Sequence, residues 1–468
     1  MSRSISLLLI LALLLSACAG PSSPPPPCFG DQQRTAAVSD TPSHRLDAAS
    51  DIPGALPTAS SSPIVLPSTL YLVAGRTYRL QYSAIIDGLD DEDTVRVNPL
   101  LGASGYRDHW EYTPPGSGTF RLSISVETGS GAIRAYSSRP MIVREASAVR
   151  SLRHLTIGDS ITRAGGYAEQ AVQTLLHGQT VGTRSYTGVS CSEGRGGWTL
   201  EKYFTRIGQP SGGDSPFLFP VNVDGAKYLG NTSFWKAVTQ GNPDAYDYAG
   251  FQILARGWQM TGPYDFDTEG YPSAPSAGDV VVDPSMATGN RWRTYTGYAW
   301  EPMNPQPGIE FSFSKYIKKY AAALAGGQPT SISIMLGTVE FLSSLSEESW
   351  ARYRARLDEL IQSIREWNKT VPVILIGAPN GGPPEAWAAK AVTSVEFNRR
   401  MLDHTRRLYE SYDREEARAN EVYVISFLGV VSEENMADYV HPKMPEGHEQ
   451  MGPWLAGMLE HLRRDGRI

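Results

Sequence analysis

The stretch Leu152-Arg153-His154-Leu155-Thr156-Ile157-Gly158-Asp159-Ser160-Ile161-Thr162 decides the fold that we expect for this chain. Its first six residues are typical of a buried strand, and a helical pattern follows from Tyr167 to Leu176. Ser160 therefore stands where a strand ends and a helix begins, at the edge of a sheet where α/β folds form their crevices. The N–H groups and the dipole of a helix start also favour a developing negative charge. Taken alone, the stretch fits an ordinary turn with Ser160 as a cap equally well.

Strands and helices alternate outward from this stretch, over residues 150–468. We expect buried strands at Ser331 to Leu336, Val371 to Gly377 and Val422 to Phe427. An amphipathic helix follows Ser346, which can cap it, and a last helix closes the chain. This alternation predicts the α/β class, with a mostly parallel sheet.

One long insertion, residues 198–312, interrupts the alternation with aromatic residues and frequent Gly and Pro. Within it, Gly278 to Asp283 and Arg293 to Thr296 predict the two strands of a hairpin. Loops of this length inside a compact domain are usually functional. Its tryptophans either form a platform on which sugar rings stack or pack as the insertion's own small core. They are Trp198, Trp235, Trp258, Trp292 and Trp300.

Residues 58–146 show a different pattern, with short alternating strands separated by turn signals. The expected strands are Thr69 to Val73, Tyr78 to Tyr82, Phe120 to Val126 and Met141 to Val143. This spacing predicts a small all-β domain, a sandwich of the immunoglobulin-like kind. It is either a spacer or packing domain or a glycan-binding module.

The first 57 residues are expected to lie outside both domains. Residues 1–18 have a positive charge, an apolar run and the ending Leu-Ser-Ala-Cys, which is similar to a bacterial lipoprotein signal with Cys18 as the lipidated residue. Residues 19–57 are rich in Pro and Ser and predict an extended tether. The protein is therefore expected to be exported and held to a bacterial membrane, in the cell envelope or at the cell surface, by its lipid. A disulfide between Cys28 and Cys191 is only weakly indicated.

Composition excludes one class of partner. The formal net charge of the 468 residues is −7, and no dense run of Lys and Arg appears. Nucleic-acid binding needs a basic face, so we expect no nucleic-acid partner. The three cysteines and eight histidines show no spacing typical of zinc sites, so we expect no metal.

A second chemical signal, Asp438-Tyr439-Val440-His441, follows the last expected strand. A serine hydroxyl needs a base to become a nucleophile, and that base needs a group that fixes its tautomer. An Asp and a His three residues apart can present both side chains to one pocket. His448 is the competing base, but its place at the start of the last helix favours a structural role.

Together, the Gly-Asp-Ser block and the Asp-x-x-His block resemble those of the SGNH (GDSL-type) hydrolase family, over roughly residues 150–468. The resemblance implies a three-layer α/β/α sandwich that acts on acyl esters without a metal or other cofactor. It also implies a catalytic triad of Ser160, Asp438 and His441.

The family's second block supplies a glycine N–H to the oxyanion hole. Glu193-Gly194-Arg195-Gly196-Gly197-Trp198-Thr199 is similar to the version of this block found in carbohydrate esterases. The resemblance implies that the N–H groups of Ser160 and Gly194 form the oxyanion hole and that Arg195 and Trp198 bind substrate. The alternative is that this stretch is a flexible turn.

The third block departs from the family pattern of Gly-x-Asn-Asp. This chain has Gly337-Thr338-Val339-Glu340, and the Val339 side chain cannot donate a hydrogen bond. Loss of one oxyanion donor costs about 10²–10³-fold in rate. Asn231 or Asn380 is a candidate replacement from another loop.

Three functions remain open at this point. The first is a serine esterase that removes acyl groups, above all acetyl groups, from a polysaccharide or oligosaccharide outside the cytoplasm. The second is an O-acyltransferase of envelope glycans that uses the same triad. The third is a lipid-anchored glycan-binding protein whose catalytic site has decayed, with Val339 as the sign of that loss.

Overall fold

The computed structural model describes residues 62–148, 151–175, 178–186, 190–209, 213–233, 251–253, 270–321, 324 and 327–468. The expectations for the signal and the tether, for Cys18 and Cys28, and for Trp235 and Trp258 lie outside these residues. The residues described all belong to one compact unit, Leu56–Ile468.

The largest sheet has eight strands, and Ser160 follows one of its central strands. Five neighbours run parallel, in the order β11, β8, β19, β20 and β21. Strand β9 pairs in parallel with β8. Beyond β11, the sheet continues with β10 and then β14, and each of these pairs antiparallel with its neighbour. The bounds are β8 Arg153–Gly158, β9 Gln179–Val181, β10 Arg184–Tyr186, β11 Ser190–Gly194, β14 Phe251–Ile253, β19 Ser331–Met335, β20 Val373–Gly377 and β21 Val422–Ser426.

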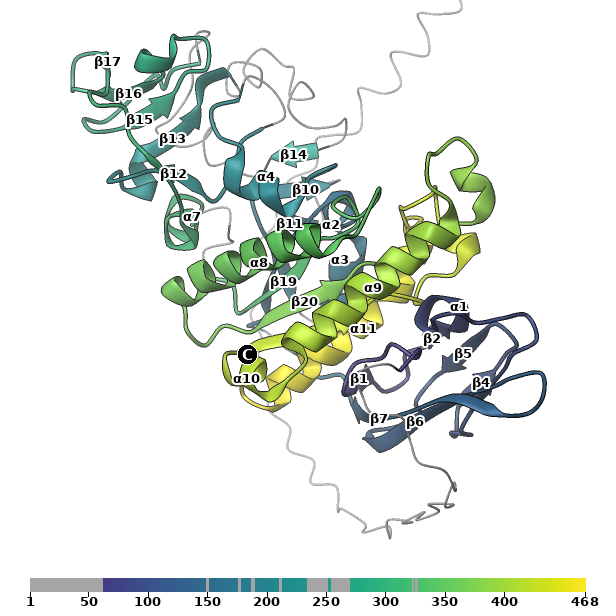
Figure 1. The fold of residues 1–468 in the computed structure, drawn as a ribbon. Coiled ribbons are helices and arrows are strands. Elements are labelled where there is room, and N and C mark those ends of the chain that lie inside the picture. The colour runs from purple at the N-terminus through teal and green to yellow at the C-terminus, as the bar shows by residue number, and fades with distance from the viewer. Residues whose placement is uncertain are drawn as a thin grey trace, which may run out of the picture. The chain divides into compact units, whose positions relative to one another are not determined.

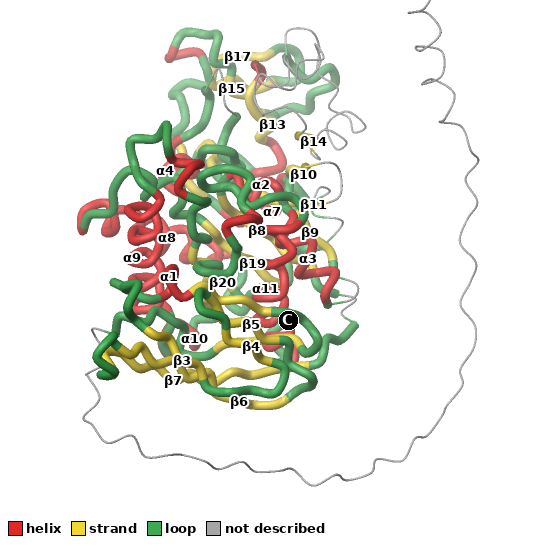
Figure 2. The backbone as a smooth tube through the Cα atoms, turned by 90° about the vertical axis from the view of Figure 1, so that its right-hand side faces the viewer, coloured by secondary structure: helices red, strands yellow, loops and turns green. Residues whose placement is uncertain are grey.

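Helices cover both sides of this sheet. Helices α8 (Glu347–Trp367) and α9 (Ser394–Tyr412) lie on one side, and α3 (Gly166–Thr174) and α11 (Glu446–Arg464) lie on the other (Figure 2). Strands β19 and β20 are buried at every residue, because both of their faces are covered. The α/β class predicted from the sequence is confirmed. Its finer identification as the three-layer sandwich of one hydrolase family stays a prediction.

The helix starts follow local sequence signals. Ser346 caps α8, where it accepts a hydrogen bond from the N–H of Ser349, whose own hydroxyl accepts from the N–H of Ser346. Thr393 and Glu396 form the same reciprocal arrangement at the start of α9. The expected capping of α8 by Ser346 is confirmed.

The N-terminal part contains a four-stranded sheet in the order β1, β7, β6, β3 and a three-stranded sheet in the order β2, β5, β4. All four strands predicted here are present, but three others were not anticipated. Those three strands are short, and none carries a long run of alternating apolar residues. The sandwich arrangement of the two sheets stays a prediction. The bounds are β1 Leu70–Val73, β2 Tyr78–Gln81, β3 Thr94–Val97, β4 Ala103–Gly105, β5 His109–Tyr112, β6 Gly118–Glu127 and β7 Ile133–Arg144.

The insertion forms small sheets of its own. The predicted hairpin strands are present as β15 (Val280–Val282) and β16 (Trp292–Tyr295), which pair antiparallel. They join β13 (Tyr228–Asn231) and β17 (Trp300–Pro302), and β12 (Leu218–Pro220) pairs with β18 (Ile309–Phe311). Trp292 is buried beside Tyr228, and Trp300 contacts Tyr271 and Tyr295. Among the tryptophans that the structure describes here, these two pack within the insertion.

The two sheets of the N-terminal part contact the α/β part along α11, which runs beside β1 (Figure 1). A side chain at Gly457 of α11 would collide with the backbone carbonyl of Tyr71 in β1, so only glycine allows this approach. Ser147 also donates to the buried carboxylate of Glu460. No helix among the described segments is both long and apolar enough to cross a membrane.

Candidate active site

The turn that carries Ser160 is fixed by its neighbours. Asp159 caps helix α2 (Ser160–Ala164) by accepting a hydrogen bond from the N–H of Ile161 at 3.0 Å. Gly158, the last residue of β8, is packed so closely that a Cβ atom would lie 2.5 Å from the carbonyl oxygen of Met335. The Gly-Asp-Ser order therefore has a local steric cause, and it places Ser160 at the carboxyl edge of the parallel sheet.

The structure brings the three predicted triad residues together. The Ser160 Oγ atom lies 2.7 Å from the His441 Nε2 atom. The other ring nitrogen, Nδ1, lies 2.7 Å from the Asp438 Oδ2 atom. A hydroxyl, an imidazole and a carboxylate in this order can move the serine proton to the imidazole while the carboxylate fixes its tautomer.

Asp438 is held in its charged form by the backbone around it. Partial burial opposes the charge, but the N–H groups of Val440 and His441 and the His441 ring together outweigh it, so the pKa of Asp438 lies below its usual range. Both N–H groups donate to Oδ1 at 2.8 Å, which leaves Oδ2 for the imidazole. One carboxylate thus shapes the loop and orients the base.

The loop that carries this pair lies between β21 and α11. It is closed by a hydrogen bond of 2.7 Å from the N–H of Ala437 to the carbonyl of His441, and by an antiparallel bridge between Met436 and Pro442. The side chains of His441 and Asp438 are 37% and 46% exposed. Both side chains are therefore partly exposed to solvent.

His448 has a structural place instead. It is buried, and its Nδ1 atom accepts a hydrogen bond from the N–H of Tyr167 at the start of α3. Burial, with a smaller effect from His441, lowers the pKa of His448 to about 4. This ring stays neutral and joins α11 to α3.

The oxyanion role expected for Gly194 stays a prediction, and the structure shows another partner for its amide. Its N–H donates to the Ser192 hydroxyl at 3.1 Å, so this group is already engaged inside the protein. Gly194 is nevertheless required, because a Cβ atom there would lie 2.6 Å from the backbone carbon of Thr162 in α2. The close packing of β11 against α2 explains the glycine without any contact to an oxyanion.

Arg195 and Trp198 are also placed differently from our expectation. Both are buried, with 3% and 5% of their surface exposed. Arg195 forms an ion pair of 2.9 Å with the buried Glu193 and lies over the ring of Trp198. Substrate contact requires an accessible surface, so these two side chains support the fold of the loop rather than meet a ligand.

Glu193 explains why this loop is buried. Its carboxylate accepts hydrogen bonds from the N–H and the hydroxyl of Thr183 and from the hydroxyl of Tyr316, which belongs to helix α7 (Phe313–Lys319). Burial raises the pKa of Glu193 to about 7, against the opposing effect of these hydrogen bonds. The residue connects the loop to the end of the insertion.

The third block contains a second carboxylate with a structural role. Glu340 accepts hydrogen bonds from the N–H of Gly337, at 2.8 Å, and from the N–H of Leu200, the first residue of helix α4 (Leu200–Thr205). Burial raises its pKa to about 7. Glu340 thus fixes the turn after β19 to the loop that follows β11.

Neither asparagine proposed as a replacement donor is placed to serve. The Asn231 Nδ2 atom donates to the carbonyl of Gln209 at 2.8 Å. The Asn380 Nδ2 atom donates to the carbonyls of Gly381 and Val431. Both amides are engaged with backbone oxygens, including those of Gln209 and Val431 in other segments of the chain, so neither is free to act in place of Val339.

Asp159 contributes electrostatically as well as through its cap. Burial raises its pKa to about 6, while the hydrogen bond from Ile161 and the nearby charge of His441 act in the opposite direction. The hydroxyl of Thr338, in the third block, also favours the charged form of Asp159.

Sequence reasoning missed the segment that supports the Asp438 loop from behind. Asn380-Gly381-Gly382 follows β20, and the N–H of Gly382 donates to the carbonyl of Tyr439 at 2.9 Å. A Cβ atom on Gly382 would collide with the carbonyl of Asp438. The paired glycines were visible in the sequence as a turn signal, but their contact with the Asp438 loop was not. Within the segments described, no group of three or more His, Cys, Asp or Glu side chains is arranged to hold a metal ion.

Comparison with known proteins gives matches only among solved structures. No model of a known protein family matches the chain. No curated protein matches it either.

The similar structures include several carbohydrate esterases. One is a family 3 enzyme from Talaromyces cellulolyticus, with 12% identity over 67% of this chain and 99% of that chain, and a TM-score of 0.30. Another is a peptidoglycan O-acetylesterase, with 13% identity over 68% of this chain and 92% of that chain, and a TM-score of 0.32. A family two enzyme from Clostridium thermocellum, in complex with cellohexaose, has 13% identity over 86% of this chain and 91% of that chain, and a TM-score of 0.29. Likeness at TM-scores of this size carries neither a fold nor a function from one protein to another.

Proposed function

We propose that this protein is a serine esterase that hydrolyses acyl esters through an acyl-enzyme on Ser160. One observation carries the proposal, namely the continuous contact from the Ser160 Oγ atom through the His441 ring to the Asp438 carboxylate, with both distances at 2.7 Å. A site that had lost its catalytic function would not be under pressure to keep this geometry. The alternative of a glycan-binding protein with a decayed site is therefore weaker than that of an esterase.

The reaction has two halves. In the first, the Ser160 oxygen attacks the ester carbonyl while the His441 Nε2 atom takes the hydroxyl proton. The imidazolium then gives this proton to the departing alcohol oxygen as the ester bond breaks. In the second half, His441 takes a proton from water as the water oxygen attacks the acyl-enzyme carbonyl. The imidazolium then gives this proton to the Ser160 oxygen as the bond to the acyl group breaks and the acid leaves.

The negative charge on the carbonyl oxygen needs hydrogen-bond donors. The N–H of Ser160 at the start of α2 is one candidate. In the loop after β11, the N–H groups of Gly194, Arg195 and Trp198 donate to Ser192, Gly158 and Arg195. Gly196 and Gly197 are further candidate donors in this loop, and Gly197 has a left-handed backbone, with φ of +69°.

The proposed substrate is an acetylated carbohydrate polymer outside the cytoplasm. The exposed triad suits an ester on a bulky chain better than one that must enter an enclosed pocket. The Glu-Gly-x-x-Gly-Trp motif resembles that of carbohydrate esterases, and the first 18 residues indicate export with a lipid on Cys18. The finer substrate and the membrane location both belong to the proposal.

The proposal is tested with protein lacking residues 1–18, beside its Ser160→Ala variant. Each is given p-nitrophenyl acetate, acetylated xylan and acetylated pectin, and released acetate is measured. We expect hydrolysis by the wild type, and a loss of about 10³-fold or more in the variant. An inert wild type would contradict the enzyme function, and activity that survives in Ser160→Ala would contradict the nucleophile.

A further inference from the structure

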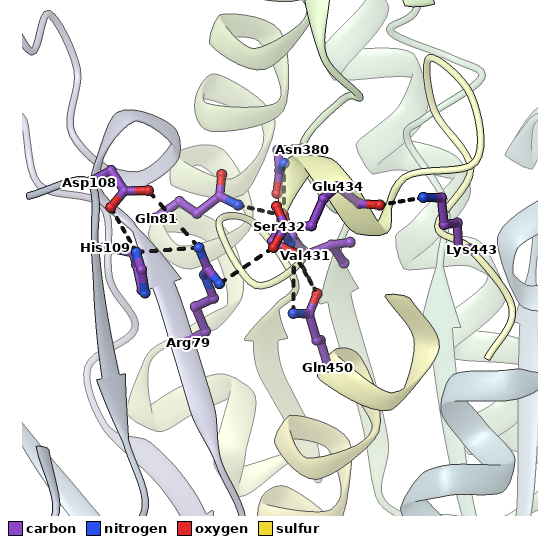
Figure 3. Close-up of polar contacts among 10 residues, drawn as sticks. All are labelled: Arg79, Gln81, Asp108, His109, Asn380, Val431, Ser432, Glu434, Lys443 and Gln450. Carbon is purple, nitrogen blue, oxygen red and sulfur yellow. Dashed lines mark hydrogen bonds and ion pairs between the residues drawn. The ribbon is translucent and has the colours of Figure 1, made fainter. Parts of the chain in front are cut away.

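The N-terminal part contacts the α/β part directly beside the loop that leads to the catalytic pair (Figure 3). Gln81, the last residue of β2, is only 9% exposed. Its N–H donates to the carbonyl of Gly429, and its side-chain Nε2 atom donates to the carbonyl of Val431, both at 2.8 Å. Gly429 has φ of +74°, and a Cβ atom there would lie 3.1 Å from the Gln81 carbonyl. This glycine allows β2 to approach the loop closely.

The carbonyl of Val431 accepts a second hydrogen bond from within the α/β part. The Asn380 Nδ2 atom donates to it at 3.2 Å, and the Asn380 Oδ1 atom accepts from the N–H of Gly429. Asn380 is buried, as are Gln81 and Val431. Two side chains from distant parts of the chain therefore meet on one buried carbonyl, and each fixes where the other can lie.

This carbonyl is connected to the catalytic pair through adjacent backbone. Asn380 is followed by Gly381 and Gly382, and the N–H of Gly382 donates to the carbonyl of Tyr439. Tyr439 lies between Asp438 and His441 in the chain. A shift of Asn380 would therefore move the support behind the carboxylate that orients His441.

A second contact from β2 reaches the same loop a few residues further along the chain (Figure 3). Arg79 of β2 lies 3.7 Å from the Glu434 carboxylate, and the Glu434 carbonyl accepts a hydrogen bond from the Lys443 ammonium group. The N–H of Lys443 donates to the carbonyl of Asn435. Arg79 also contacts the His109 ring at 3.3 Å, which holds its guanidinium in place on the N-terminal part.

We infer that Gln81 is a positioning residue for the catalytic loop, so that the N-terminal part is a component of the active site's support rather than a separate module. The inference rests on the proposed esterase function. Gln81 touches neither the substrate nor the reacting atoms. It fixes the Val431 carbonyl, to which the Asn380 side chain also donates, and through Asn380 and Gly382 it supports the backbone beside Asp438. A displacement of about 1 Å in a catalytic group can cost roughly 10²-fold in rate. Loss of the Gln81 donor should therefore slow the chemical step.

The test compares Gln81→Met, which keeps the side chain's length but removes its donor, with Ser83→Ala, an exposed position two residues further on the same segment. The full-length protein is used throughout. The rate at which a fluorophosphonate labels Ser160 reports nucleophile activation, and hydrolysis of p-nitrophenyl acetate gives kcat and KM. Amide hydrogen exchange of residues 429–443 reports the loop itself.

We expect Gln81→Met to lower both the labelling rate and kcat by about 10-fold or more, with KM within 2-fold of wild type, because positioning acts on the transition state. Exchange of the loop amides should become faster, and Ser83→Ala should match the wild type in every measurement. Arg79→Gln, which removes the ion pair with Glu434 together with the contact to the His109 ring, should show a smaller loss of the same kind and serves if Gln81→Met does not fold.

If Gln81→Met folds and has wild-type rates, the inference is overturned. If only Arg79→Gln folds, wild-type rates in that variant overturn it. A loss that appears only in KM would overturn it too. A wild type that neither labels nor hydrolyses contradicts the proposed function instead, and the exchange measurement then still reports whether β2 holds the loop.

Discussion

Ser160 and His441 are 281 residues apart in the chain, yet the Ser160 Oγ atom and the His441 Nε2 atom lie 2.7 Å from each other. The parallel sheet makes this approach possible, because β8 delivers Ser160 and the loop after β21 delivers His441 to the same edge. The reactive pair is thus a product of sheet topology, and the local sequences only supply the residues.

Asp438→Asn should test whether the carboxylate orients the base. At present one carboxylate oxygen accepts from the backbone N–H groups of Val440 and His441, and the other contacts the His441 Nδ1 atom. If the amide of the variant keeps its oxygen on the backbone N–H groups, its NH₂ group faces Nδ1 and favours the imidazole tautomer with its proton on Nε2, which cannot accept the serine proton. We expect kcat on p-nitrophenyl acetate to fall by about 10³–10⁴-fold, with little change in KM. Circular dichroism should show an intact fold. A fall of less than 10-fold in a folded variant would show that Asp438 has no such role.

Val339→Asn tests the missing oxyanion donor. If the turn after β19 faces the developing charge as its sequence position indicates, an amide there should raise kcat by up to about 10²-fold. Val339→Leu is the matched control, since it has a similar shape without a donor. Equal rates for the two variants would mean that this turn does not contact the oxyanion.

Gly197→Ala tests the loop donor that remains once Gly194 is engaged. Gly197 has φ of +69°, and no atom lies within 4 Å of the Cβ position, so the substitution strains the backbone without a clash. Gly75, with φ of +70° and an equally open Cβ position, is a matched control in the N-terminal part. Both Ala variants should lose about 1–2 kcal/mol of unfolding free energy. Only Gly197→Ala should also lower kcat, by 10-fold or more. Unchanged kcat in both would exclude the Gly197 amide.

Glu340 should make stability depend on pH. Its pKa is raised by burial from its ordinary value of 4.5 to about 7. Between these two values the folded protein holds a proton that the unfolded chain releases, so this group's contribution to stability falls as pH rises through that window. Glu340→Gln cannot ionise. We expect its Tm, relative to wild type, to rise between pH 5 and pH 7.5.

The control for this measurement is Glu410→Gln on the exposed surface of α9, which should follow the wild type across the same pH range. A Tm difference between Glu340→Gln and wild type that stays constant from pH 5 to pH 7.5 would show that Glu340 does not titrate in this window.

The sequence by itself determined those features that depend on short-range patterns. Short segments rich in apolar residues predicted the parallel strands β8, β19, β20 and β21, because a strand covered on both faces has no side that faces solvent. Ser346 predicted the start of α8, and Asp438 and His441 were recognisable because a spacing of three residues already brings their side chains together. The α/β class followed from such local evidence, and so did the proposal of Ser160, Asp438 and His441 as a triad.

Only the tertiary structure decided what each remaining polar group contacts. The sequence alone does not show that the Gly194 N–H donates to the Ser192 hydroxyl. It also does not show that Arg195 is buried in an ion pair with Glu193, a carboxylate that accepts hydrogen bonds from Tyr316 and Thr183 as well. Gln81 and Val431 lie 350 residues apart, and no pattern in either neighbourhood announces their hydrogen bond. A buried donor or acceptor must find a partner, but its identity is set by packing across the whole chain, which sequence spacing does not encode.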